Sequence, residues 1–119
     1  MKSRSLKKMR TLKILTHKDE ALANRLIRDK KTSTYTIFYH SEWDKWSNRI
    51  LALAEEWAQG EGDEECYVVS SWELPHLFSA FGITSAPSVV KVRKGNVKVF
   101  VEYPRIYEYF TPPKAQTPE

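Results

Sequence analysis

The strongest constraint on the fold is a regular alternation of strand-like and helix-like segments along the chain. Strand character, from β-branched and aromatic residues, appears in residues 11–15, 34–40, 66–71, 88–93 and 97–103. Apolar residues at helical spacing occupy residues 19–30, 46–59 and 75–81. A strand-helix-strand order implies parallel pairing, whereas the turn Lys94-Gly95-Asn96 predicts an antiparallel hairpin. The chain is therefore predicted to form an α/β structure with a mixed sheet of about four to five strands and helices on both faces.

Composition places the chain in the class of single-domain globular proteins. It has 119 residues and one cysteine, Cys66, so no disulfide can form within it. A single cysteine favours a reducing compartment. We find neither an apolar run of membrane-spanning length nor a secretory signal, and therefore expect a cytoplasmic location.

Charge divides the chain into three regions. Residues 1–10 are expected to be a mobile basic arm, residues 11–110 the folded domain, and the proline-rich residues 111–119 a disordered tail. The net charge is +4, and the arm alone exceeds it, so the rest of the chain is slightly acidic. The arm has no acid and five cations: Lys2, Arg4, Lys7, Lys8 and Arg10. The arm could contact a nucleic acid or another anionic surface, but it lacks interleaved aromatic residues and could equally be a solvated terminus.

Two stretches resemble the thioredoxin family. The segment Tyr39-His40-Ser41-Glu42-Trp43-Asp44-Lys45-Trp46-Ser47 is similar to the family's F-W-A-E-W-C-G-P-C. Residues 81–90, with the later Arg93-Lys94-Gly95-Asn96, resemble Y-G-I-R-G-I-P-T-L-L and K-N-G-E, so that Pro87 takes the place of the family's cis-proline. The resemblance covers roughly residues 11–110. It implies a three-layer thioredoxin-like fold, here with a shortened C-terminal helix.

In this alignment the redox motif is absent, because Asp44 and Ser47 stand where the family has its two cysteines. A one-residue shift would place Trp43 and Trp46 there, but Asp44 and Ser47 keep Glu42-Trp43 in register. Thiol–disulfide exchange needs a thiolate, so neither alignment supports it. Asp44 is expected to cap the following helix, and Cys66 to be a buried structural residue.

A candidate binding surface surrounds the former redox positions. In thioredoxin-like proteins the backbone before the cis-proline pairs with an extended peptide or with glutathione, which implies a role for Ala86 and Pro87. Trp43, Trp46 and Trp72 could supply apolar contacts beside it. The alternative is that Pro87 serves only the fold and that Trp46 belongs to the core.

The C-terminus offers a second candidate surface. Lys91 lies in a strand where the family usually has an apolar residue, and only residues 105–110 are expected to be helical. One sheet face could therefore be incompletely covered. Aromatic side chains could pack over that face or form a patch for a partner: Tyr103, Tyr107, Tyr109 and Phe110.

These observations predict a redox-inactive thioredoxin-like protein that binds a protein partner as a structural or accessory subunit, and no enzyme. The alternative is a glutathione- or peptide-binding domain of a diverged enzyme, in which Tyr39 or Ser41 would orient the thiol. No cofactor and no metal are expected, since the three histidines have no metal-ligand spacing: His17, His40 and His76.

Overall fold

Five strands form one mixed β-sheet in the structure, a computed structural model that describes residues 8–70 and 72–111. The strands are β1 (Thr11–Ile14), β2 (Thr34–His40), β3 (Glu65–Ser70), β4 (Ser88–Arg93) and β5 (Asn96–Phe100). Their order across the sheet is β1-β3-β2-β4-β5. The first three run parallel, whereas β4 is antiparallel to β2 and β5 is antiparallel to β4. The predicted mixed sheet with a closing hairpin is confirmed.

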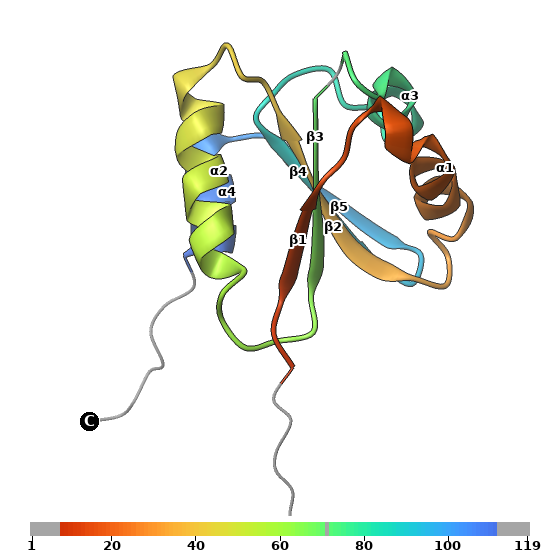
Figure 1. Ribbon diagram of the computed structural model, residues 1–119, viewed down its shortest axis with the longest axis horizontal. Helices are drawn as coiled ribbons and strands as arrows, with labels where there is room; N and C mark the ends of the chain where they lie inside the picture. Colours follow the sequence, from red (N-terminus) through yellow and green to blue (C-terminus); the bar gives the residue numbers. More distant parts are fainter. Residues whose placement is uncertain (1–7, 71, 112–119) are drawn as a thin grey trace, which may run out of the picture.

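Helices cover both faces of the sheet. They are α1 (Glu20–Arg28), α2 (Lys45–Trp57), α3 (Pro75–Ala80) and α4 (Tyr103–Phe110). Helices α1 and α3 lie on one face, and α2 and α4 lie on the other (Figure 1). This is the predicted three-layer arrangement. None of the helices in the described part of the chain is long and apolar enough to cross a membrane.

A capping box opens the first helical segment. The Asp19 carboxylate accepts a hydrogen bond from the Thr16 backbone N–H at 2.9 Å, and the Thr16 hydroxyl accepts one from the Lys18 N–H at 3.2 Å. These contacts satisfy N–H groups that have no partner within the helix. A 3-10 turn over His17–Asp19 then leads into α1.

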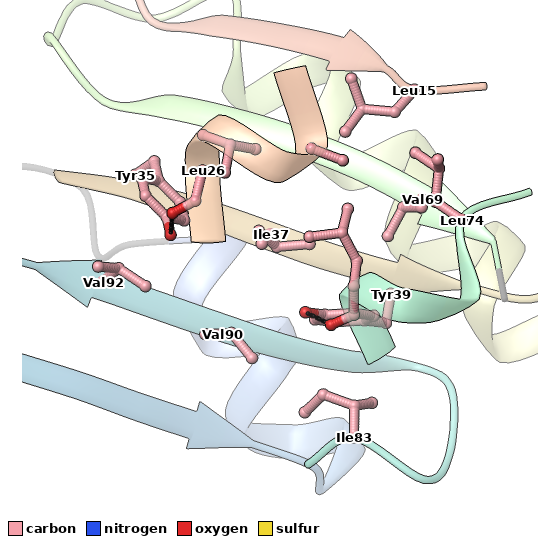
Figure 2. Packing of buried hydrophobic residues seen from close by; sticks show 12 residues of the cluster. Leu15, Leu26, Tyr35, Ile37, Tyr39, Val69, Leu74, Ile83, Val90 and Val92 are labelled. Carbon is pink, nitrogen blue, oxygen red and sulfur yellow. Dashed lines mark hydrogen bonds between the residues drawn. The ribbon is translucent and has the colours of Figure 1, made fainter. Parts of the chain in front are cut away.

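Alternation along β2 divides the core in two, because successive side chains of a strand point to opposite faces of the sheet. Ile37 and Tyr39 pack toward α1 and α3, whereas Phe38 packs toward α2 and α4. Figure 2 shows the first cluster, in which the Tyr39 hydroxyl donates to the Leu77 carbonyl oxygen at 2.9 Å. Burial disfavours the phenolate and raises the pKa of Tyr39.

The last strand and the last helix differ slightly from expectation. Strand β5 ends at Phe100 rather than at residue 103, and α4 begins at Tyr103 rather than at residue 105. Pro104 explains the earlier start of α4, because a residue without a backbone N–H fits the first turn of a helix. The helix has eight residues and buries Ile106 and Phe110.

Arg10 belongs to the folded domain, so its expected place in a mobile arm is wrong. Its guanidinium donates to the Glu64 carboxylate at 2.9 Å and to the Trp57 carbonyl oxygen at 3.2 Å. It also lies 4.9 Å from the centre of the Trp57 ring. Just before it, the Lys8 carbonyl oxygen accepts the Gly62 N–H at 3.0 Å. Lys2, Arg4 and Lys7 of the predicted arm, and residues 112–119 of the predicted tail, lie outside the described residues.

Candidate functional site

Three segments meet at one edge of the sheet. Strands β2 and β3 are parallel and end together at His40 and Ser70, and β4 starts beside them because Ser88 pairs with Tyr39. The loop 41–44 then enters α2, the chain after β3 carries Trp72, and residues 84–87 precede β4. The topology therefore brings together the loop 41–44, Trp72 and the loop 84–87.

Asp44 and Ser47 are joined by hydrogen bonds at the start of α2. The Asp44 carboxylate accepts the Ser47 backbone N–H at 3.1 Å and the Ser47 hydroxyl at 3.2 Å. Ser47 is completely buried, and Asp44 is half-buried. The carboxylate satisfies a free N–H group and lies at the positive end of the helix dipole. The expected capping role of Asp44 is what the structure displays.

The loop before β4 borders a hollow of about 290 Å³. The Ala86–Pro87 peptide bond is cis, and the Ser88 hydroxyl donates to the Ser85 carbonyl oxygen at 2.7 Å. Within residues 8–70 and 72–111, the backbone N–H groups of Thr84 and Ala86 have no hydrogen-bond partner. The hollow is lined by His40, Ser41, Asp44, Phe78, Ile83, Thr84, Ser85 and Ala86. Asp44 and Ala86, distant in sequence, thus border one hollow.

Trp43 and Trp72 flank a second, neighbouring hollow of about 420 Å³. The two side chains are 86% and 63% exposed. His40 lies between the two hollows and lines both; its Nε2 is 2.9 Å from the Asn48 Oδ1 atom. Two large, exposed indoles therefore line one recess, an arrangement that suits an apolar ligand group.

Trp46 does not line these hollows. It is 42% exposed, its ring centre lies 4.7 Å from that of Tyr103, and the Arg49 guanidinium lies 5.1 Å from its ring centre. The buried stripe of α2 runs through Ser47, Ile50, Ala54 and Trp57, which turns Trp46 to the margin. It is neither a core residue nor a neighbour of Trp43 in the hollow.

The C-terminal aromatic residues do not form one exposed patch. Phe110 is 3% exposed and packs against Trp57, with ring centres 5.3 Å apart. The Tyr109 hydroxyl lies 2.8 Å from the Thr36 hydroxyl oxygen, over the sheet. Tyr107 is exposed, and Tyr103 is half-buried against Trp46. Helix α4 turns Tyr109 and Phe110 inward, so the patch is wrong for these two residues.

Cys66 has no access to the candidate site. The side chain is 1% exposed in the core beneath α2 and α4. Burial disfavours the thiolate and raises the pKa of Cys66 to about 12. This environment supports the structural interpretation of the residue. Among residues 8–70 and 72–111, no three His, Cys, Asp or Glu side chains gather closely enough to hold a metal ion.

Sequence reasoning missed six residues that line the hollows: His40, Glu42, Phe78, Ile83, Thr84 and Ser85. Thr84 and Ser85 could have been included from their place directly before Ala86-Pro87. His40 carries a weaker signal, since a histidine at the end of a strand is equally typical of an ordinary turn. Only the structure shows that His40 lines the same hollow as Trp43 and Trp72.

Similarity to known proteins is found among solved structures. No protein-family model matches the chain, and no curated protein matches it. The structure resembles the thioredoxin of Malassezia sympodialis, with a TM-score of 0.65, 14% identity, and coverage of 92% of this chain and 95% of that one. For the thioredoxin of Schistosoma mansoni the TM-score is 0.64 and the identity 16%, over 85% of this chain and 94% of that one.

A third similar structure is the thioredoxin of Trichomonas vaginalis. Its TM-score is 0.57 and its identity 21%, over 85% of this chain and 94% of that one. At such identities the similarity establishes a shared fold. The chain therefore has the thioredoxin-like fold, and its single cysteine leaves it without the CxxC pair.

Proposed function

We propose that this thioredoxin-like chain is a redox-inactive binding module that holds an extended segment of a partner protein, as an accessory or structural subunit of a larger assembly. The observation that carries the proposal is the pair of exposed tryptophans, Trp43 and Trp72, which line one recess. Thr84 and Ala86 present unpaired N–H groups beside it in the described structure.

A binding role fits the chemistry of this surface. Backbone N–H groups at the margin of a sheet can pair with an extended peptide, while neighbouring recesses accept its side chains. Tryptophan is enriched at binding hot spots because it buries a large rigid surface. An apolar side chain of the partner would enter the recess between Trp43 and Trp72, and its backbone would run along Thr84–Ala86.

Asp44 and Cys66 both disfavour a redox role. A carboxylate at position 44 cannot form a mixed disulfide, and Cys66 is buried away from the surface. We expect no turnover above background in an insulin-reduction assay. The proposal includes a reducing, cytoplasmic location, which rests on the single unpaired cysteine.

Affinity capture followed by mass spectrometry tests the binding role. The wild type is compared with Trp43→Ala and Trp72→Ala, and with Val99→Ala as a control that removes exposed apolar surface from β5. We expect both tryptophan variants to lose the same captured protein, and Val99→Ala to retain it. Peptides from that protein should then shift the amide resonances of residues 84–86. Equal capture by all four proteins would refute the proposal.

Glutathione binding is the alternative function, and the hollow of about 290 Å³ is the candidate site for it. Tyr39 is wrong as its thiol-orienting residue, because the side chain is completely buried and its hydroxyl already donates to Leu77. Ser41 remains at the hollow. A glutathione titration followed by tryptophan fluorescence distinguishes the alternatives: saturation at millimolar ligand would favour glutathione, and an unchanged signal would favour the protein partner.

A further inference from the structure

The turn end of the β4–β5 hairpin carries a group of cations on one face of the sheet. Lys91 and Arg93 of β4 and Asn96 and Lys98 of β5 line a hollow of about 130 Å³, called the cationic hollow below. It lies at the opposite end of β4 from Ser88, which borders the candidate functional site. The two sites are therefore separate.

Strand register forces these cations together. Lys91 pairs with Lys98 across the two strands, and Arg93 pairs with Asn96. Residues directly opposite each other in an antiparallel pair have Cβ atoms roughly 5 Å apart, and like charges in that position destabilise the sheet. Lys91 and Arg93, two residues apart on one strand, share the same face. The hairpin thus holds three positive charges in an arrangement that opposes its own stability.

No acidic side chain of the described residues forms an ion pair with the group. Within residues 8–70 and 72–111, no salt bridge involves Lys91, Arg93 or Lys98. Glu64 is close enough to affect Lys91, but its carboxylate is paired with Arg10 at 2.9 Å. Glu64 and Glu65 both line a neighbouring recess to which Lys91 and Arg93 also contribute. There Glu65 accepts a hydrogen bond from Tyr67 at 3.2 Å.

The short helix α4 leaves this part of the face open. Tyr109 of α4 lies at the margin of the cationic hollow, where its ring centre is 5.6 Å from the Lys91 ammonium. Partial burial is the main cause that lowers the pKa of Lys91, and the neighbouring positive charges of Arg93 and Lys98 add to it.

We propose that the cationic hollow binds a phosphate group, either as inorganic phosphate or as a phosphate ester. Two ammonium groups, one guanidinium and an amide supply donors for a multiply charged oxyanion, and the guanidinium fork matches two phosphate oxygens. The hollow of about 130 Å³ places these donors around one common recess. A bound dianion would also relieve the repulsion between Lys91 and Lys98.

Nuclear magnetic resonance titration of the whole chain tests this inference. The two probes are inorganic phosphate and glycerol 3-phosphate, with sodium chloride at matched ionic strength as the reference. We expect saturable shifts confined to residues 91–98 and to Tyr109, and no comparable change with chloride. The probe that binds more tightly identifies the source of the phosphate, free or esterified.

A pair of variants with the same change in charge makes the test specific. Lys98→Gln should weaken phosphate binding about tenfold, whereas Lys18→Gln, at an exposed position outside the cationic hollow, should change it less than twofold. Without phosphate, Lys98→Gln should unfold at an equal or higher temperature than the wild type, because one repulsion is gone. Linear shifts with both probes, or equal weakening by the two substitutions, would overturn the proposal.

Discussion

Replacing Asp44 with alanine should destabilise the chain by about 2 kcal/mol or more, through two separable effects. Loss of a helix N-cap costs about 1 kcal/mol on its own. Asp44 also accepts the hydroxyl hydrogen of Ser47, which is completely buried. A buried hydroxyl left without a partner costs about 1–3 kcal/mol. We add the two costs because the cap concerns the backbone N–H of Ser47, whereas the second cost concerns its side-chain hydroxyl.

Three further variants separate the effects. Asp44→Asn keeps an oxygen acceptor for the cap and loses only the interaction of a charge with the helix dipole, about 0.3–1 kcal/mol. Ser47→Ala removes the buried hydroxyl together with its need for a partner, so its cost should be below about 1 kcal/mol. The double variant Asp44→Ala/Ser47→Ala should lose only the cap. Its cost should therefore fall at least ~1 kcal/mol below the sum of the single costs.

Urea unfolding followed by far-ultraviolet circular dichroism measures these differences. With a slope of about 1–3 kcal/mol per molar urea, the Asp44→Ala midpoint should fall by roughly 1 M. The hydrogen-bonded cap would be refuted if Asp44→Ala cost no more than Asp44→Asn. Strict additivity in the double variant would likewise refute the claim that Asp44 satisfies the Ser47 hydroxyl.

Other contacts give predictions of the same kind. Cys66 should resist alkylation at pH 8 until urea unfolds the chain. Because the Cys66 pKa is raised from 9.0 to about 12, its contribution to stability should be complete below pH 9 and lost as the pH rises toward 12, which urea titrations of wild type and Cys66→Ala can compare. Arg10→Met should cost about 1–2 kcal/mol in urea unfolding, and Arg10→Lys should recover little, because only the guanidinium can donate to Glu64 and Trp57 together. Tyr39→Phe should cost about 1–2 kcal/mol by the same measurement, since it leaves the Leu77 carbonyl oxygen without the hydroxyl donor.

Local signals were sufficient for the elements and for most of their boundaries. The composition of residues 34–40 identified β2, and Thr16 with Asp19 identified the start of the first helical segment. Pro104 could have indicated the start of α4, because proline fits the first turn of a helix. The order of the strands was not fixed by the handedness and pairing rules for β-α-β units, because β3 lies between β1 and β2, whereas strands that follow each other in the chain are usually neighbours.

Long-range contacts were beyond local reasoning. Arg10 looked like one more cation of a basic terminus, and only its approach to Glu64, 54 residues away, places it in the fold. Tyr109 and Phe110 looked like candidates for exposure, but the register of α4 over the sheet turns them toward Thr36 and Trp57. The cationic hollow has the same origin, because strand pairing sets Lys91 opposite Lys98.

In the candidate site, the residues that stabilise the fold differ from those that we propose bind a partner. Asp44 and Ser47 satisfy each other and the helix terminus, so their presence is explained without any ligand. Trp43 and Trp72 are the opposite case: among the described residues neither indole has a hydrogen bond or a ring contact, and both are largely exposed. Exposed indoles of this size contribute little to folding, since they bury little surface. What the fold does not explain at this edge is therefore the pair of tryptophans, and the case for a binding partner rests on them rather than on the positions that resemble the redox motif.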